Sequence, residues 1–180
     1  NYRAWLKDHF LDFADEVFAI YPASRDADVR QAVIALHDDY VCAQTVQALA
    51  KDTARAGQKA YLYYFSYPAK GASASLGSYH TLELSFVGGG HFRKARWGEP
   101  DAEDWKLAGI MSGYWTQFAA TGNPNRPGLP IWPVFNLKVD LCLELGREIR
   151  VRPTPHRERF GVFERSLKSR LASIRRHSGL

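Results

Sequence analysis

The segment at residues 59–67 constrains the fold of this chain more than any other. It reads Lys-Ala-Tyr-Leu-Tyr-Tyr-Phe-Ser-Tyr, contains no glycine or proline, and ends at Pro68. Aromatic residues favour extended backbone, and successive side chains of a strand point to opposite faces of a sheet. Because both faces of this segment are apolar, it is typical of an inner strand that helices cover on both sides. The sequence therefore predicts one buried inner strand.

Helical segments lie on both sides of this strand in the sequence. Apolar residues recur at the period of an amphipathic helix in the following segments: residues 1–20, a stretch that opens at Ser24 or Asp26 and continues or bends into a helix at about 40–56, residues 101–120, and residues 156–174. Two shorter apolar segments, 138–145 and 147–152, meet at Gly146 and predict a hairpin. The expected fold is α/β, with flanking helices and a hairpin at one edge of the sheet.

This predicted sheet is short of strands. An inner strand needs a neighbour at each edge, and the hairpin covers one edge at most. The sequence contains no internal repeat, low-complexity tract or linker that would divide it. We therefore expect residues 1–180 to be the C-terminal part of a single α/β domain.

The composition narrows the possible partners. Hydrophobic residues make up 46% of the 180 residues and charged residues 24%, and no apolar run reaches the roughly 18 residues that span a bilayer. Much of the net charge of +5 lies between Arg147 and Arg176, where Glu158 and Glu164 interrupt the cations. We expect neither a membrane span nor a nucleic-acid partner.

The two cysteines, Cys42 and Cys142, do not have the spacing of a redox motif or a metal site. Free cysteine behaves as a small hydrophobic residue. We expect both to be buried thiols, and we expect no metal and no cofactor.

Among the histidines, His80 is the candidate for chemistry. It follows the predicted strand on a loop that contains Gly77 and Ser78, and α/β sheets place their ligands at such loops. On this evidence alone, a structural histidine is the better interpretation. His91 follows three glycines, in the reverse order of an HGGG oxyanion motif and at the wrong position for one, so we expect a loop there. The remaining histidines lie among charged residues and are expected at the surface: His9, His37, His156 and His177.

Several blocks of the sequence resemble type-B carboxylesterases, the family that includes cholinesterases and bacterial para-nitrobenzyl esterases. Residues 77–87, Gly-Ser-Tyr-His-Thr-Leu-Glu-Leu-Ser-Phe-Val, are similar to the family's GA-x-H-x-x-EL-x-F-V-F segment. The other blocks occur in the family's order: Tyr21-Pro22 for YP, 39–42 for D-x-x-F-C, 60–65 for VYxYxF, 114–125 for W-T-x-F-A-x-T-G-x-P-N, and 131–135 for WPxY. The resemblance covers nearly the whole chain and corresponds to about the last third of such an enzyme.

This resemblance implies an α/β-hydrolase fold and the hydrolysis of carboxylic esters by a serine, a Glu or Asp, and a histidine. His80 matches the catalytic histidine. Because the chain order in this fold is serine, acid, histidine, the first two are expected upstream of Asn1, and the sequence contains no G-x-S-x-G motif. The resemblance implies a supporting hydrogen-bonding role for Glu83 and a structural role for Asp39.

The resemblance also implies partners. They are a small ester substrate, the N-terminal portion of the same enzyme, and a second copy bound through the helices at 12–20 and 157–172. Secreted relatives join a cysteine near Cys42 to one in the C-terminal helix, but Phe160 stands at that second position, so this disulfide is not expected. The absence of an N-x-S/T site fits a bacterial protein that is cytoplasmic, periplasmic or secreted. Two alternatives remain, a cholinesterase-like adhesion protein without catalysis and a small independent binding module.

Overall fold

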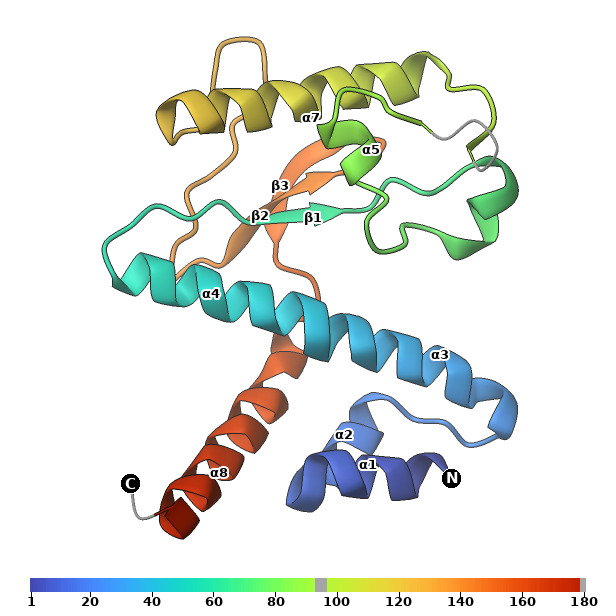
Figure 1. Ribbon diagram of the computed structural model, residues 1–180, viewed down its shortest axis with the longest axis vertical. Helices are drawn as coiled ribbons and strands as arrows, with labels where there is room; N and C mark the ends of the chain where they lie inside the picture. Colours follow the sequence, from blue (N-terminus) through green and yellow to red (C-terminus); the bar gives the residue numbers. More distant parts are fainter. Residues whose placement is uncertain (93–96, 179–180) are drawn as a thin grey trace. The chain divides into compact units, whose positions relative to one another are not determined.

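The computed structural model describes residues 1–92 and 97–178 (Figure 1). The chain divides into two compact units, which are described separately. One consists of Asn1–Asp52 with Pro155–Leu180, and the other of Thr53–Thr154. Within the described residues, no helix is both long and apolar enough to cross a membrane. That residues 1–180 belong to a single catalytic domain stays a prediction.

The first unit is helical. Its helices are α1 (Tyr2–Phe10), α2 (Ala14–Ile20), α3 (Asp26–His37), the start of α4 (Gln44–Arg55) and α8 (Phe160–Ser178). The helix predicted over 1–20 is two helices, because Leu11 adopts a φ of 51° and a 3₁₀ turn, Leu11–Phe13, separates them. Between α3 and α4 the helical path continues through a π-helical turn at Asp38–Ala43. The helices enclose an apolar core that includes Leu6, Phe10, Val17, Leu36 and Phe163.

A buried carboxylate, Asp39, joins three parts of this helical unit. Its side chain accepts hydrogen bonds from the Tyr21 hydroxyl at 2.8 Å and from Arg159 Nη1 at 3.2 Å, and it lies 2.9 Å from His156 Nδ1. This agrees with the structural role expected for Asp39. The prediction that His156 is simply solvated is wrong, since its half-exposed ring binds the buried acid.

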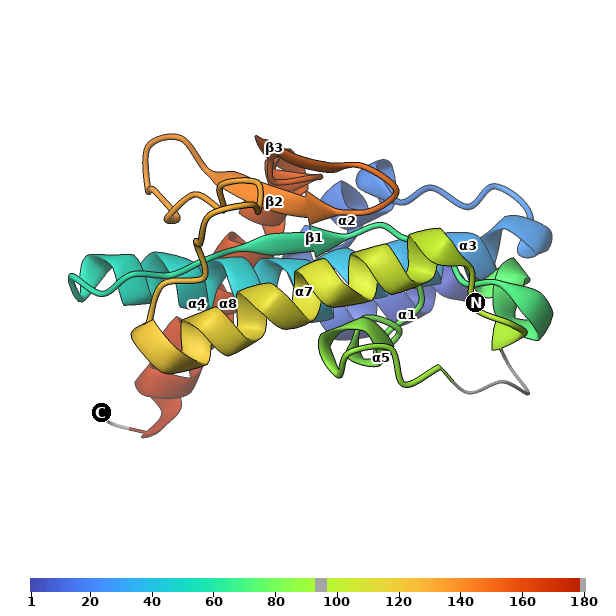
Figure 2. The ribbon, with the colours of Figure 1, turned by 90° about the horizontal axis from the view of Figure 1, so that it is seen from above.

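The second unit contains a three-stranded mixed sheet of order β1-β2-β3. β1 (Tyr63–Phe65) runs parallel to β2 (Leu141–Leu145), which pairs antiparallel with β3 (Ile149–Pro153). The predicted hairpin is confirmed, as β2 and β3. Helices α5 (Leu84–Val87) and α7 (Ala102–Thr121) pack against each other beside the sheet (Figure 2).

The strand predicted at 59–67 is present as β1, and within the described residues only one of its edges is paired. β1 is three residues long, and among the described strands it pairs with β2 alone. Tyr63 and Tyr64 are 36% and 40% exposed, whereas Leu143 and Leu145 of β2 are fully buried. Burial at the centre of a sheet requires a partner at both edges, and β2 is the strand that has two. Within residues 1–92 and 97–178 the hairpin therefore supplies the central strand, and β1 pairs with another strand at one edge only.

Helix α7 begins and ends where the sequence predicts. Asp101 caps it, with its Oδ1 accepting from the backbone N–H groups of Glu103 and Asp104 at 2.9 and 3.1 Å, and Gly122 ends it with a left-handed φ of 71°. Trp105 and Phe118 are about half exposed, and the buried positions include Leu107, Ala108, Met111 and Tyr114. Both cysteines are free thiols, with Cys142 buried and Cys42 half-buried.

Candidate functional site

His80 lies on a loop that leaves the carboxyl end of β1. The loop makes a 3₁₀ turn at Gly71–Leu76 and then returns to its starting point. Two hydrogen bonds close its base: Ala69 N–H to the Gly77 carbonyl at 3.0 Å, and the Ser78 hydroxyl to the Tyr67 carbonyl at 2.7 Å. Ser78, two residues before His80, is therefore bound to Tyr67, two residues after β1.

The His80 side chain itself is exposed. Within residues 1–92 and 97–178, no hydrogen bond or ion pair involves its ring. The backbone on either side is ordered by short-range bonds, since Leu82 N–H donates to the Tyr79 carbonyl at 3.1 Å and the Leu82 side chain is buried. The structure thus presents His80 on an anchored backbone with its ring accessible.

Thr81, directly after His80, has a φ of 72°. This left-handed conformation is strained for a β-branched residue, and strained backbone is concentrated at functional sites. It also breaks any regular helical turn between His80 and Glu83. The two side chains are therefore not placed on one side by a regular helix.

Glu83 is partly buried and stands immediately before α5. Its carbonyl accepts hydrogen bonds from the N–H groups of Phe86 and Val87, both at 2.9 Å. Burial, with the nearby charge of Glu83 adding to it, raises the pKa of Tyr63. Glu83 is thus close to β1, and its supporting role toward His80 stays a prediction.

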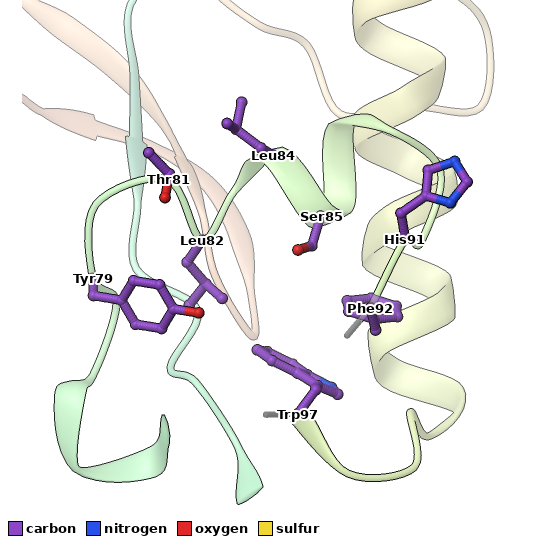
Figure 3. A pocket seen from close by; sticks show the side chains of 8 residues that line it. All are labelled: Tyr79, Thr81, Leu82, Leu84, Ser85, His91, Phe92 and Trp97. Carbon is purple, nitrogen blue, oxygen red and sulfur yellow. The ribbon is translucent and has the colours of Figure 1, made fainter. Parts of the chain in front are cut away.

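A cavity of about 320 Å³ opens beside this loop. Tyr79 and Thr81, which flank His80, contribute to its wall, and Figure 3 shows the wall with His91 at one end. The lining residues are Tyr79, Thr81, Leu82, Leu84, Ser85, His91, Phe92 and Trp97. The cavity therefore adjoins the His80 loop, although the His80 ring is not among its lining groups.

The glycine segment before His91 is a tight turn. The N–H groups of Gly90 and His91 both donate to the Ser85 carbonyl, at 3.0 and 3.1 Å, so neither is available to an oxyanion. Gly90 has a φ of 98°, and a Cβ at this position would collide with the ring of Trp105. This is the loop that the sequence predicts, with glycine required where the chain crosses α7.

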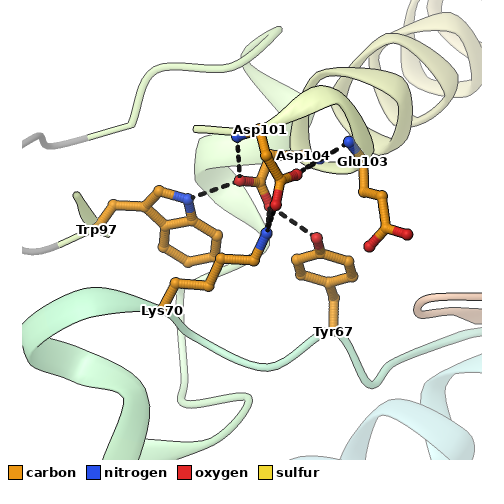
Figure 4. A network of polar contacts seen from close by, with 6 residues as sticks. All are labelled: Tyr67, Lys70, Trp97, Asp101, Glu103 and Asp104. Carbon is orange, nitrogen blue, oxygen red and sulfur yellow. Dashed lines mark hydrogen bonds and ion pairs between the residues drawn. The ribbon is translucent and has the colours of Figure 1, made fainter. Parts of the chain in front are cut away.

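A buried polar cluster joins the His80 loop to the start of α7, and sequence reasoning missed it (Figure 4). Asp104 is fully buried and accepts hydrogen bonds from the Tyr67 hydroxyl at 2.7 Å, from Trp97 Nε1 at 3.2 Å and from the Asp101 N–H at 2.9 Å. Lys70 Nζ lies 2.8 Å from Asp104 and 2.6 Å from Asp101. The only signal in the sequence was the pair of acids at the start of a helix, which its N-cap explains equally well.

The charges in this cluster stabilise each other. Burial alone would raise the pKa of Asp104, but hydrogen bonds from Lys70 and Tyr67 outweigh it and hold that pKa below its usual range. Burial, together with the bond to Asp104, raises the pKa of Tyr67 to about 12. The pKa of Lys70 is raised, because its bonds to Asp101 and Asp104 outweigh its desolvation. At neutral pH the cluster therefore contains two carboxylates, an ammonium group and a neutral phenol.

No group of three or more His, Cys, Asp or Glu side chains that could hold a metal ion occurs in the part of the chain that the structure describes.

Comparison with known proteins identifies the family. A model described as the carboxylesterase family matches residues 4–163. The chain belongs to the carboxylesterase family.

Individual relatives agree with this assignment. The chain is 29% identical to dog carboxylesterase 5A over 81% of its length, and 39% identical to mouse carboxylesterase 3B over 53%. It spans 23% and 18% of those two proteins. The structure of a thermophilic PNB esterase matches 89% of this chain, with a TM-score of 0.72 and 24% sequence identity. The match covers 32% of the esterase chain. The fold is thus a portion of the α/β-hydrolase fold, as predicted.

Proposed function

We propose that this chain supplies the catalytic histidine, His80, of a serine carboxylesterase. The observation that carries the proposal is the position of His80, on an anchored loop beyond the carboxyl end of β1, within the segment matched by the carboxylesterase family. Its ring is exposed, so a group from outside the described residues can reach it. The substrate class is a small carboxylic ester.

The chemistry assigned to His80 is proton transfer. Its imidazole takes the proton of a serine hydroxyl as the serine oxygen attacks the ester carbonyl, and then gives that proton to the departing alcohol. In the second half of the reaction it activates a water molecule in the same way. A Glu or Asp that accepts a hydrogen bond from the other ring nitrogen orients the imidazole and stabilises its charged form.

The serine and the acid are assigned to an N-terminal portion of the same enzyme, because the chain spans only 18% and 23% of the two relatives named above and contains no G-x-S-x-G motif. Among the described strands β1 pairs with β2 alone, and Tyr63 is 36% exposed, which supports this proposal. An upstream strand paired at the other edge of β1 would extend the sheet and cover Tyr63. Residues 1–180 alone should therefore hydrolyse a nitrophenyl ester no faster than background.

Glu83 is assigned a supporting role, as a partly buried hydrogen-bonding group near His80 and not as the acid of the triad. Its charge acts on Tyr63, the first residue of β1, and a partly buried carboxylate is stabilised by a hydrogen-bond partner. Glu83→Gln should lower kcat by roughly 10–100-fold, as loss of such outer groups does elsewhere. A loss as large as that of His80→Ala would make Glu83 a member of the triad.

A homodimer through the helical segments 12–20 and 157–172 is the proposed assembly. In support, Leu167, Leu171 and Ile174 are 48–60% exposed and recur at the spacing of one face of α8. An apolar stripe of this kind is typical of a helix that packs against another one.

The test of the proposed function uses the full-length protein and p-nitrophenyl acetate. His80→Ala should lower kcat by several orders of magnitude and leave KM nearly unchanged. His91→Ala is the matched control, since His91 is also exposed and lines the neighbouring cavity, and it should retain most of the activity. A loss below tenfold for His80→Ala, or an equal loss for both variants, contradicts the assignment.

A further inference from the structure

The Asp104 carboxylate is the most completely enclosed acid of the sheet-containing unit, and the esterase chemistry does not use it. Its side chain is fully buried, and four donors surround it: the Tyr67 hydroxyl, Trp97 Nε1, the Asp101 N–H and Lys70 Nζ, at 2.7 to 3.2 Å. A buried carboxylate is costly unless every lone pair has a partner, and here the partners come from two segments of chain.

Two of those donors, Tyr67 and Lys70, belong to the start of the His80 loop. Tyr67 is buried, and its ring packs edge-on against Phe86 with 5.3 Å between centroids. Its carbonyl accepts the hydroxyl of Ser78, two residues before His80. Asp104 therefore fixes the Tyr67 side chain, and the Tyr67 backbone binds Ser78 at the other end of the loop.

The chain after His80 is tied to the same place. Leu82 and Phe86 are buried, and Phe86 packs on Trp97 with 5.6 Å between ring centroids. Trp97 in turn donates to Asp104. Both arms of the segment that carries His80 thus converge on one carboxylate at the first turn of α7, as Figure 4 shows for its polar part.

We propose that Asp104 is a positioning residue for His80, acting through Tyr67 and Lys70. The inference rests on the proposed function. A histidine that moves a proton must be held within a fraction of an ångström of its productive place, and a shift of about 1 Å can lower the rate 100-fold. His80 has no bond of its own that could hold it among the described residues, so its place depends on the backbone that the cluster fixes.

The variants are chosen to loosen the cluster without emptying it. Asp104→Asn keeps the size of the side chain but removes the charge that pairs with Lys70. Lys70→Met removes the ammonium group, and Tyr67→Phe removes a single hydroxyl. Glu103→Gln is the matched control, because Glu103 is an exposed acid of the same helical turn and its side chain lies outside the cluster (Figure 4).

Two measurements are made on the full-length protein. With p-nitrophenyl acetate, Asp104→Asn should lower kcat by about 10–100-fold with KM changed less than about twofold, and Lys70→Met and Tyr67→Phe should lower it less. In ¹⁵N-histidine NMR, with the His80 signals assigned by their loss in His80→Gln, these variants should shift or broaden the imidazole signals of His80. Glu103→Gln should change neither reading.

The NMR reading separates this inference from the esterase proposal. A wild-type protein that hydrolyses no ester overturns the esterase proposal alone, and the His80 signals then still decide the positioning role. Unchanged His80 signals in a folded Asp104→Asn protein overturn the inference. If Asp104→Asn does not fold, unchanged His80 signals in both Lys70→Met and Tyr67→Phe overturn it equally.

Discussion

Each unit of the molecule contains a buried aspartate that binds several separate groups, Asp39 in one and Asp104 in the other, and the two aspartates differ in what they hold together. Asp39 in the helical unit binds Tyr21, His156 and Arg159, which are far apart in the sequence. It joins the ends of helices. Asp104 in the sheet-containing unit binds groups within a shorter stretch of chain, on either side of His80.

Burial of a carboxylate therefore does not by itself indicate a functional site. Both acids accept a tyrosine hydroxyl and pair with a cation, and both are nearly or fully inaccessible. What differs is the segment that each one fixes. Only the partners of Asp104 carry the loop in which the family resemblance places a catalytic group. Function is therefore inferred from connectivity and not from burial.

The largest effect is expected from removing either carboxylate. Asp104→Ala leaves two buried neutral donors, Tyr67 and Trp97, without an acceptor, whereas Asp39→Ala leaves one, Tyr21. Each orphaned buried donor costs about 1–3 kcal/mol, so two cost about 2–6 kcal/mol. The lost ion pair adds little, because Lys70 is partly exposed and keeps Asp101 as a partner. We expect Asp104→Ala to lose about 2–6 kcal/mol of unfolding free energy and Asp39→Ala about 1–3 kcal/mol less than that. Urea unfolding of the full-length variants measures both. An equal or larger loss of unfolding free energy for Asp39→Ala would contradict this expected difference between the two units.

The second prediction concerns acid. The pKa of Asp104 is lower in the folded protein than in the unfolded chain, because the bonds from Lys70 and Tyr67 outweigh burial. The stabilisation is therefore complete above the unfolded pKa, about 3.9, and is lost as the pH falls through the folded pKa. The stability gap between wild type and Asp104→Asn should be constant from pH 5 to 7 and should shrink below about pH 4. Unfolding curves at pH 7, 5, 4 and 3 test this, and a gap that stays constant to pH 3 contradicts it.

The third prediction uses a left-handed residue from each unit. Thr81 and His156 have φ values of 72° and 58°. Thr81→Gly should stabilise the protein by about 1 kcal/mol, since glycine removes the strain at some entropic cost. His156→Gly should destabilise it, since the ring that binds Asp39 is lost. Thermal unfolding of the two variants measures the contrast. A destabilising Thr81→Gly would show that the conformation is not strained.

Much of this arrangement could be predicted from the sequence, because it depends on local patterns. The periodicity of α7 and the turn at Gly146 are short-range signals, and both elements are confirmed. The central position of β2 could not be read from the sequence, because it depends on which strands pair. The apolar pattern at 59–67 indicates a strand that needs cover on both faces, but it does not show which segments provide that cover.

The site shows the same division. His80 could be identified from the sequence, because the residues that resemble the family motif, 77–87, are contiguous. The Asp104 cluster unites residues 67, 70, 97, 101 and 104, and no spacing rule connects a tyrosine after a strand with an acid at a helix start. Such clusters become visible only when the loop is closed in space. Likewise, His156 reads as a surface residue until Asp39 is placed against it.

The smallest effect on stability is expected at the apolar stripe of α8. Leu171 is 48% exposed at the centre of this stripe, so Leu171→Lys should change the unfolding free energy of a monomer by no more than about 0.5 kcal/mol. In the proposed homodimer, however, each Leu171→Lys substitution places a charge in the apolar contact, and both subunits carry one. Sedimentation of the full-length protein should therefore change from dimer to monomer. Ser169→Lys, an exposed position on the same helix, is the control and should leave the dimer intact. A wild-type monomer at micromolar concentration, or an unchanged Leu171→Lys dimer, contradicts the assembly, and the exposed stripe would then have to face another part of the enzyme.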